Sequence, residues 1–302
     1  MNDAVGTDKT AAPARPFVEV ENLRVVLPTG ERSEVEAVRQ VDLVIHEGER
    51  VGIVGESGSG KSVTGRSIAG LLPRSPRVRV SGSIRLAGRE MVGAPDPEWD
   101  AVRRSRVGMI FQDPLTFLNP VMRVGRQVAE SIPPGREGDA SARRDAVHRF
   151  LGRAGLDNPD QVAAKFPHEL SGGMRQRVLI AIAIAKLPQL IIADEPTTAL
   201  DVTVQQRVLA TLDATVRDLG TSLILISHDL AVVAEMTDRV YVMYGGRIVE
   251  EGATQRVISD PQHPYTKALL RSVRSLTDDG VELYSMPREL RRQLNQEAAH
   301  AS

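Results

Sequence analysis

The sequence contains no cysteine among its 302 residues. Disulfides, thiolate metal sites and a cysteine nucleophile are therefore excluded. Neither sign of charge is in excess, because 38 lysines and arginines are balanced by 39 acids, for a formal net charge of −1. A generally basic surface would give a clear positive excess, so we expect no nucleic-acid partner.

Long apolar stretches are also missing. The longest purely apolar run, Val178 to Ala185, is far too short to span a bilayer. The first residues, MNDAVGTDKTAAPARP, lack the basic-then-apolar pattern of a secretion signal, and we expect a disordered leader over 1–16. These absences predict a cytosolic chain that can still dock on a membrane protein.

The residues that remain have the composition of an ordinary globular protein, with 41% hydrophobic and 25% charged. Strand-length apolar runs alternate with helix-like segments, which predicts a parallel sheet covered on both faces. The predicted strands span 17–26, 37–46, 51–54, 83–86, 107–111, 190–193 and 222–227, followed by a hairpin of 240–244 and 247–251. The predicted helices span 63–72, 96–106, 124–132, 140–155, 174–186, 202–219 and 230–236.

The stretch GESGSGKS fits the phosphate-loop pattern G-x-x-x-x-G-K-[ST], between a predicted strand and a predicted helix. Its glycines let backbone N–H groups point at phosphate oxygens, and the following helix adds the positive end of its dipole. We expect Lys61 to reach the β- and γ-phosphates and the Ser62 hydroxyl to bind Mg²⁺. The alternative, a glycine-rich turn before a helix, explains less well why a predicted strand precedes the stretch and a predicted helix follows it. The predicted nucleotide-binding residues here are Gly55, Glu56, Ser57, Gly58, Ser59, Gly60, Lys61, Ser62 and Val63.

Two acids, Asp194 and Glu195, follow the buried strand predicted at 190–193. A strand in a parallel sheet delivers its carboxyl end to the ligand crevice. We expect Asp194 to hold Mg²⁺ and Glu195 to polarise the attacking water, as a general base or an orienting group. Considered alone, the two acids could simply end a strand and cap the helix that follows it. The phosphate loop upstream favours the catalytic interpretation.

The segment LSGGMRQR, residues 170–177, stands directly before a long apolar helix. Such a helix N-terminus attracts anions, although Ser171 could simply cap the helix. The chain already has one phosphate loop. A second anion site would therefore need a second phosphate or a second subunit.

Together these segments resemble the ATP-binding subunit of an ABC transporter, over about residues 17–270. GESGSGKS matches the Walker A motif, LIIADE Walker B and LSGGMRQR the signature. Gln112 in IFQDP matches the Q-loop, Ala199 to Asp201 the D-loop, and His228 in ISHD the switch histidine. All of them occur in the family's order.

The resemblance implies an α/β fold: a P-loop NTPase (RecA-like) core with an N-terminal antiparallel β-subdomain and an inserted α-helical subdomain. The expected organisation is a leader over 1–16, the ATPase domain over 17–271 with its helical subdomain at about 90–165, and a polar C-terminal tail over 272–302. Trp99 is expected to anchor the first helix of that insertion.

The family's mechanism implies that two such domains face head to tail. Each ATP then lies between one Walker A and the partner's signature, so Ser171, Gly172 and Gly173 would act on the partner's nucleotide. Asp201 would cross the dimer interface, although it could also cap its own helix.

The resemblance implies Glu195, His228 and Gln112 as catalytic residues. His228 would contact the γ-phosphate, with a structural role beside a helix cap as the alternative. The predicted Mg²⁺ ligands are Ser62, Gln112 and Asp194, and Gln112 would also report the nucleotide state to a transmembrane partner.

Five segments together resemble the ATPases of dipeptide and oligopeptide importers: GESGSGKS, IFQDPLTFLNP, FPHELSGGMRQR, ADEPTTALDVTVQ and DPQHPYTKALL. That group includes relatives that import nickel or other small solutes. The methionine of SGGMRQR resembles one of two subunit types, which favours a non-identical ATPase partner. The implied assembly adds two transmembrane permease subunits near the loop 113–120 and an extracytoplasmic solute-binding protein, and it places this chain at the cytoplasmic face of the cell membrane.

The chain departs from that group in two ways. Many members bind an iron–sulfur cluster through a cysteine-rich C-terminal segment; without cysteine, we expect no such cluster here. The tail segment RELRRQLNQEAAH is expected to be a solvated helix or coil. The loop 27–30 has no aromatic residue to stack on adenine, so we expect base recognition to rest on aliphatic packing and to discriminate ATP from GTP less strictly.

The favoured function is an ATP-hydrolysing subunit that energises an importer of di- or oligopeptides, with nickel or another small solute as the alternative cargo. One rival is a non-transport ABC ATPase that acts on DNA or ribosomes. Its long coiled coil, tandem cassettes and basic stripe are all missing from the sequence. A regulatory nucleotide-binding module without turnover is disfavoured by Glu195 and His228, since both are hydrolysis residues.

Overall fold

The computed structural model of the chain describes residues 15–135, 138–198 and 200–274. The predicted leader and polar tail, with the segment 288–300, therefore fall almost entirely outside the described residues. Within the described ranges, no helix is both long enough and apolar enough to cross a membrane.

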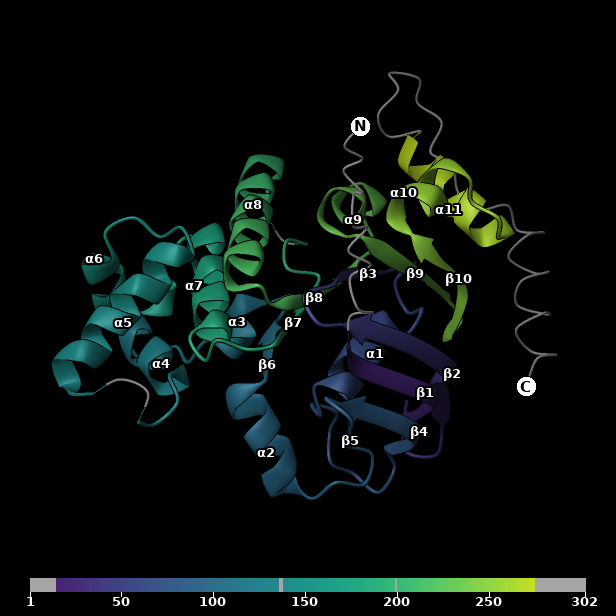
Figure 1. The fold of residues 1–302 in the computed structure, drawn as a ribbon, viewed down its shortest axis with the longest axis horizontal. Coiled ribbons are helices and arrows are strands. Elements are labelled where there is room, and N and C mark those ends of the chain that lie inside the picture. The colour runs from purple at the N-terminus through teal and green to yellow at the C-terminus, as the bar shows by residue number, and fades with distance from the viewer. Residues whose placement is uncertain (1–14, 136–137, 199, 275–302) are drawn as a thin grey trace, which may run out of the picture.

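A four-stranded antiparallel sheet forms the N-terminal part of the structure, in the order β2-β1-β4-β5 (Figure 1). β1 and β2 are longer than predicted. At Asn22 of β1 the backbone φ is +49° and the register shifts, so that apolar side chains point to the same face before and after this irregularity. The strands are β1 (Pro16–Pro28), β2 (Glu34–His46), β4 (Arg79–Leu86) and β5 (Arg89–Glu90).

The second sheet has six strands in the order β10-β9-β3-β8-β7-β6. Five of them are parallel, as predicted, and the edge strand β10 pairs antiparallel with β9. The predicted hairpin is confirmed: Gly245 and Gly246 make its turn with φ of +55° and +86°. The strands are β3 (Arg50–Val54), β6 (Val107–Ile110), β7 (Leu190–Asp194), β8 (Ser222–Ser227), β9 (Arg239–Tyr244) and β10 (Arg247–Ala253).

Helices cover the parallel sheet on both faces. The helices of the described residues, including those outside these two layers, are α1 (Lys61–Ile68), α2 (Asp96–Ser105), α3 (Pro114–Phe117), α4 (Val124–Ser131), α5 (Ala140–Arg153), α6 (Pro159–Ala164), α7 (Gly172–Ile184), α8 (Val202–Leu219), α9 (Leu230–Met236), α10 (Thr254–Ser259) and α11 (Pro264–Arg274), with a 3₁₀ turn, η1 (Pro167–Glu169).

Alternate residues of β7 show why the strand is apolar throughout. Leu190 and Ile192 belong to one core, which includes α1 and the antiparallel sheet, whereas Ile191 and Ala193 belong to the other, which includes α7 and α8. A strand buried on both faces has no position for an exposed polar side chain. The first polar side chain of this strand, Asp194, therefore comes at its carboxyl end.

The helices α4, α5 and α6 gather beside α7 in a lobe at one end of the molecule (Figure 1). They enter the chain between β6 and β7, and α7 leads back to the parallel sheet. The predicted fold class is therefore confirmed: a P-loop core, an antiparallel β-subdomain and a helical insertion. The range predicted for the insertion, about 90–165, also contains β6 of the central sheet.

The helix after the phosphate loop ends at Ile68, earlier than predicted. Gly70 then takes φ +64°, and a Cβ at this position would lie 2.2 Å from the ring of Trp99. Trp99 is 9% exposed, so its predicted role as the anchor of α2 is confirmed. The helices α3, α6, α10 and α11 were not predicted.

Candidate nucleotide-binding site

The phosphate loop connects β3 to α1 and is held close to β9. A Cβ at Gly55 would lie 2.1 Å from the carbonyl oxygen of Met243, so only glycine fits there. Gly58 and Gly60 take φ of +81° and +102°. Gly60 is the N-cap of α1 and no side chain caps this helix, so its first amides carry a partial positive charge for an anion.

Lys61 is buried, and its ammonium is held by the loop itself. Its Nζ donates to the carbonyl oxygens of Gly55 at 2.7 Å and Glu56 at 2.8 Å. Burial lowers the pKa of Lys61, while the charges of Glu195, Asp194 and Glu56 partly oppose that shift. A phosphate anion beside the ammonium would further favour its charged form.

Ser62 and Asp194 place two oxygen atoms side by side. The Ser62 hydroxyl lies 2.6 Å from Asp194 Oδ1, and Asp194 is 1% exposed. The other carboxylate oxygen, Oδ2, is 3.4 Å from the guanidinium of Arg66, an α1 residue that the sequence motifs did not single out.

Hydroxyl and carboxylate oxygens are ligands that Mg²⁺ prefers, so Ser62 and Asp194 fit the predicted metal. Among the described residues, no group of three or more His, Asp and Glu side chains could hold a metal ion. A Mg²⁺ ion here would therefore rely mainly on phosphate oxygens and water, as is usual for this ion. Gln112, the third predicted ligand, instead directs its amide nitrogen to Glu195, at 3.4 Å.

The carboxylate of Glu195 is the meeting point of three polar side chains. Its Oε2 lies 2.7 Å from Thr198 Oγ1, 3.3 Å from His228 Nδ1 and 3.4 Å from Gln112 Nε2. The side chain of Glu195 is 14% exposed and that of His228 is 55% exposed, so the histidine stands on the solvent side. Thr198 was missed by the sequence analysis, although it lies in the TT pair that follows Walker B.

Glu195 has an unusual backbone as well. Its φ is +46°, in the left-handed region that glutamate seldom adopts. The amide of Glu195 donates to the carbonyl of Ile226 in the neighbouring strand at 2.9 Å, which holds this conformation in place. Strained backbone of this kind often marks a functional position.

These groups line one cleft of about 580 Å³, the size of a small-molecule site. Its walls are the phosphate loop, Gln112, Glu195, Thr198 and His228, together with Ala37 of β2, whose carbonyl oxygen lies close to Gly60. The described residues that line the cleft include no aromatic side chain. The structure thus brings Gln112, Asp194, Glu195 and His228 to the phosphate loop.

The signature residues lie elsewhere. Ser171 and Asp201 each cap a helix, since their side chains accept from the amides of Met174 at 3.3 Å and Val204 at 3.0 Å. A Cβ at Gly173 would lie 2.3 Å from Val204 Cγ1, so the start of α7 packs closely against the start of α8. Ser171, Gly172, Gly173 and Asp201 are absent from the lining of the cleft, and Ala199 is outside the described residues.

Gln176 connects the signature helix to the cleft. This side chain is 1% exposed, and its Nε2 donates to the carbonyl of Phe111 at 3.1 Å, directly before Gln112. No local pattern predicts this contact, because the two residues are 65 positions apart.

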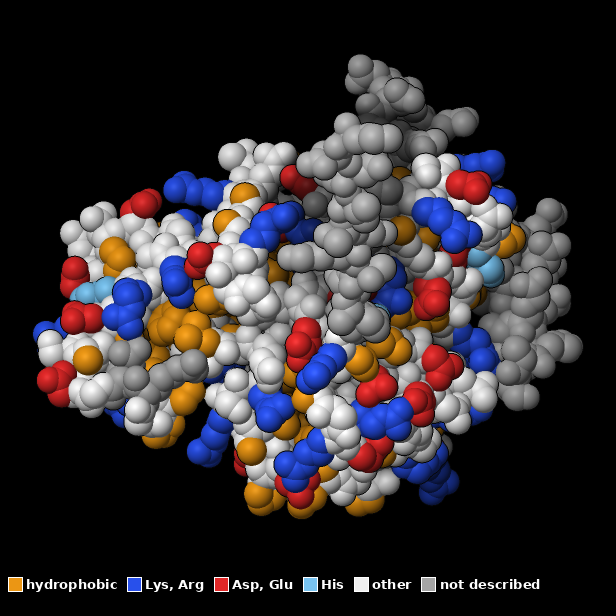
Figure 2. Space-filling view, in the orientation of Figure 1, with side chains coloured by type: hydrophobic (Ala, Val, Ile, Leu, Met, Phe, Trp, Pro, Cys, Tyr) orange, Lys and Arg blue, Asp and Glu red, His pale blue; other side chains and the backbone are white. Residues whose placement is uncertain are grey.

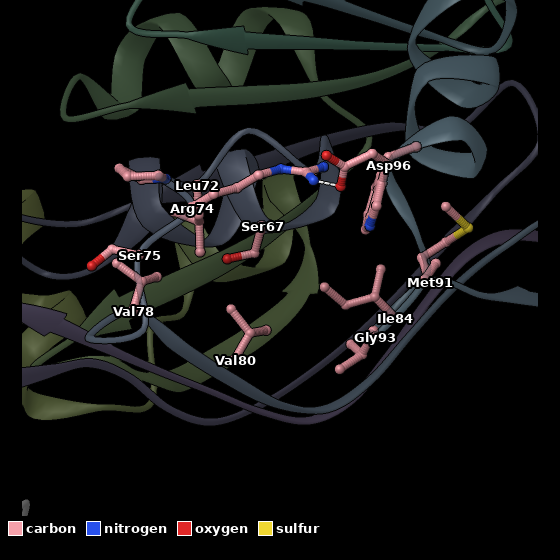
Figure 3. Close-up of a pocket in the computed structure, with 15 residues that line it drawn as sticks. Ser67, Leu72, Arg74, Ser75, Val78, Val80, Ile84, Met91, Gly93 and Asp96 are labelled. Atoms are coloured by element: carbon pink, nitrogen blue, oxygen red, sulfur yellow. Dashed lines mark ion pairs between the residues drawn. The ribbon is translucent and has the colours of Figure 1, made fainter.

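A second cavity, of about 260 Å³, lies between the end of α1, β4 and the start of α2. Figure 3 shows its aliphatic wall, with Val80 and Ile84, and the ion pair of Arg74 and Asp96. None of the predicted site residues lines this cavity. The chemistry therefore belongs to the cleft at the phosphate loop.

The face shown in Figure 2 carries positive and negative side chains intermixed, with no continuous basic stripe. This distribution agrees with the near-zero net charge of the whole chain.

Comparison with protein families gives two matches. Residues 38–198 match the family "ABC transporter", and residues 249–298 match "Oligopeptide/dipeptide transporter, C-terminal region". The oligopeptide transport ATP-binding protein OppD of Bacillus subtilis is 45% identical over 266 residues, which cover 88% of this chain and 74% of the relative. The protein of the same name from Salmonella typhimurium is 42% identical and covers 91% and 81%.

Solved structures give the same result for the fold. A dimeric post-hydrolysis structure of the ATP-binding cassette MJ0796, bound to ADP and Pi, superposes with a TM-score of 0.69 at 29% identity. The superposition covers 78% of this chain and 98% of that one. CbiO1 from Clostridium perfringens, described as part of the ABC transporter complex cbiONQ, gives a TM-score of 0.67 at 27% identity and covers 81% and 91%.

Proposed function

The chain belongs to the ABC transporter family, and on that premise we propose that it is the ATP-hydrolysing subunit that energises an importer of di- or oligopeptides. One observation carries the catalytic part of the proposal. Gln112, Thr198 and His228 all meet the carboxylate of Glu195 at the mouth of the phosphate-loop cleft. A passive nucleotide-binding module has no use for that arrangement.

ATP would bind with its phosphates on the uncapped N-terminus of α1. The amides there and the ammonium of Lys61 would neutralise the β- and γ-phosphates. Two of the three ammonium protons of Lys61 are donated to the loop carbonyls, and the third would reach a phosphate oxygen. Ser62 and Asp194 would hold Mg²⁺, which supplies further neutralisation of phosphate charge when bound.

Hydrolysis would use Glu195 as the group that positions and deprotonates the attacking water. The water oxygen forms a bond to the γ-phosphorus as the bond to the β-phosphate oxygen breaks, and the water proton passes to the carboxylate. His228, on the solvent side of Glu195, would bond the γ-phosphate. Gln112 and Thr198 would fix the carboxylate orientation.

A second ATPase subunit would complete the site. Ser171, Gly172 and Gly173 present their helix N-terminus away from the chain's own cleft, which supports an action on a partner's nucleotide. The relative with a TM-score of 0.69 is described as dimeric with ADP and Pi bound. We propose a non-identical partner, on the methionine of the signature, and an interface that includes Asp201.

The names of the relatives support the cargo class. Two relatives at 42–45% identity are oligopeptide transport proteins, and the C-terminal region matches an oligopeptide/dipeptide transporter family. The assembly would therefore contain two permease subunits and an extracytoplasmic solute-binding protein, with this chain at the cytoplasmic face of the membrane. The loop after Gln112 exposes Leu115 and Phe117, at 56% and 46%, as a surface for the permease.

Purification of the chain with its associated subunits tests the proposal. We expect membrane subunits to co-purify, and we expect ATP hydrolysis by the reconstituted complex to rise when the binding protein is loaded with peptides. Nickel chelates and sugars serve as control ligands, and stimulation by one of these instead would overturn the cargo class. Recovery with DNA or ribosomes, or a complex that does not hydrolyse ATP, would overturn the function.

A further inference from the structure

Tyr265, near the start of α11, contacts the phosphate loop. This residue belongs to the HPYT sequence, which the catalytic role leaves unexplained. Its side chain is fully buried, with its ring centroid 4.5 Å from that of Tyr244. The backbone N–H of Glu56 donates to its hydroxyl oxygen at 2.7 Å. A residue 209 positions away therefore binds the second residue of the loop.

The peptide groups around Glu56 also hold the catalytic-site lysine. Lys61 Nζ bonds the carbonyls of Gly55 and Glu56, and the amide of Ser59 donates to the Glu56 carbonyl at 3.1 Å. The Glu56 N–H is thus occupied by tyrosine and that of Ser59 by the Glu56 carbonyl, which leaves other amides of the loop for phosphate. Any movement of Tyr265 would displace the carbonyls that position Lys61.

The segment before Tyr265 is itself fixed to the sheet. The carboxylate of Glu250, on β10, accepts from the amides of Gln262 at 2.7 Å and His263 at 3.0 Å. The amide of Tyr265 in turn lies 3.2 Å from His263 Nδ1. These bonds place the start of α11 at one position relative to the parallel sheet, so the tyrosine hydroxyl is presented from a rigid support.

We propose that Tyr265 is a positioning residue of the nucleotide site, through which the C-terminal region fixes the phosphate loop in the geometry that binds ATP. The inference rests on the proposed ATPase function. It gives the C-terminal region a direct contact with nucleotide binding, because residues 249–298 include both Glu250 and Tyr265.

The chemistry of the hydroxyl suits a permanent contact. Burial raises the pKa of Tyr265, so the phenol stays neutral at any pH at which the protein would be assayed. The neutral oxygen remains an acceptor for the Glu56 amide. The contact therefore does not titrate, and its effect on ATP affinity is independent of pH.

The substitution Tyr265→Phe in the full chain tests the role, because it keeps the ring against Tyr244 and removes only the acceptor. The Glu56 N–H then loses its partner, and the loop carbonyls lose their fixed position. We expect the Kd and KM for ATP to rise about tenfold, the scale for an unmatched buried donor. The kcat at saturating ATP should change by less than about twofold, since the acid and histidine of the cleft are untouched.

Tyr241→Phe is the matched control. Tyr241 is 2% exposed, and its hydroxyl bonds the backbone amide and carbonyl of Val44, at 3.1 and 3.2 Å. Neither residue lines the phosphate-loop cleft. This variant loses the same kind of bond, and we expect comparable thermal destabilisation with unchanged ATP affinity.

Equal ATP affinity in the two variants, whatever their melting temperatures, would show that Tyr265 only stabilises the fold and would overturn the inference. A fall in kcat without a change in KM would overturn it as well. Failure of the unmodified chain to bind ATP is a different result, because it would remove the proposed function itself.

Discussion

The phosphate loop and the signature segment are both glycine-containing turns that precede a helix, yet the N-termini of the two helices are capped differently. Gly60 begins α1 without any side-chain cap. Ser171 begins α7 with its own hydroxyl on the amide of Met174. The first helix end keeps its amides for a ligand, whereas the second already has one amide satisfied within the chain.

The glycines of the two segments also serve different purposes. In the phosphate loop they allow left-handed backbone and close approach to β9. In the signature, Gly173 makes room for Val204 of α8. The side chains of Gln112, Glu195 and His228 line the cleft at the first segment. The comparison teaches that one helix end stays open to a ligand beside titratable side chains, whereas the other is closed by its own serine. Under the proposed function, the second region would recognise a nucleotide bound to a partner.

The largest expected effect is a loss of ATP hydrolysis, and it tests the phosphate-loop region. Glu195→Gln keeps the shape of the cleft and removes the base, so we expect kcat to fall at least about 100-fold with ATP affinity retained. Steady-state hydrolysis and equilibrium nucleotide binding measure the two quantities. Hydrolysis within a few-fold of the unmodified chain would exclude Glu195 from proton transfer.

The next effect tests whether the signature acts on a partner. Ser171→Arg places a bulky cation at the start of α7, outside the chain's own cleft, so nucleotide binding by the single chain should persist. ATP-driven association with the partner ATPase, followed by light scattering or sedimentation, should weaken at least about tenfold, by the scale of a misplaced charge at an interface.

Ser141→Arg is its control, because Ser141 is exposed on α5, belongs to neither segment and does not line the phosphate-loop cleft. Equal association of the two variants with the partner would contradict a role for the signature in trans.

A smaller expected effect is on stability. It shows which of the two signature glycines is required for packing. A Cβ at Gly173 would lie 2.3 Å from Val204 Cγ1, whereas a Cβ at Gly172 would lie 3.3 Å from Leu200 Cδ2. We expect Gly173→Ala to lower the free energy of unfolding by about 2 kcal/mol more than Gly172→Ala, as overpacking does. Denaturant unfolding measures this, and Val204→Ala in the same chain should restore the loss. Equal stability of the two alanine variants would show that the packing tolerates a methyl group.

The smallest expected effect is a change of stability with pH. It concerns Lys186, a lysine outside both regions that serves as a reference for Lys61. Lys186, between α7 and β7, donates to the carbonyl of Arg103 at 2.7 Å. Burial, aided by the charge of Arg103, lowers its pKa from 10.5 to about 8. Lys61 differs because its neighbours are acids.

The sign of the pH dependence follows from that shift. Between pH 8 and 10.5 the folded state has released the Lys186 proton while the unfolded state still binds it, so stability rises with pH across this window. Relative to Lys186→Met, the unmodified chain should gain about 2 kcal/mol from pH 7 to pH 9.5, as measured by urea unfolding. If the free energies of unfolding of the two proteins change in parallel with pH, the lowered pKa of Lys186 is refuted.

Local sequence signals predicted much of the fold. Hydrophobic runs located the strands of the parallel sheet, and Asp201 and Gly220 delimit α8 as predicted. Their physical causes act within a few residues, so a sequence can show them. The end of α1 was misplaced although its signal is local: Gly70 takes the left-handed conformation, and the amides of Leu71 and Gly70 bond the carbonyls of Arg66 and Ser67.

The site was predictable only where a motif concentrates its residues. The motifs predicted Lys61, Asp194 and Glu195 because a phosphate loop and the end of a buried strand can both be recognised from a few consecutive residues. Arg66, beside Asp194, and Tyr265, beside Glu56, come from contacts between remote segments. No periodicity or spacing encodes such pairs, so only the folded structure showed them.

The left-handed backbone of Glu195 sets a practical limit on engineering this protein. At φ +46° a glycine or an asparagine would relieve strain on the order of 1 kcal/mol. A screen that selects only for heat resistance would therefore favour such variants at position 195 and would discard the carboxylate to which we assign the activation of water. Thermostabilised forms of the protein should be selected with turnover as a second criterion, or with position 195 held constant.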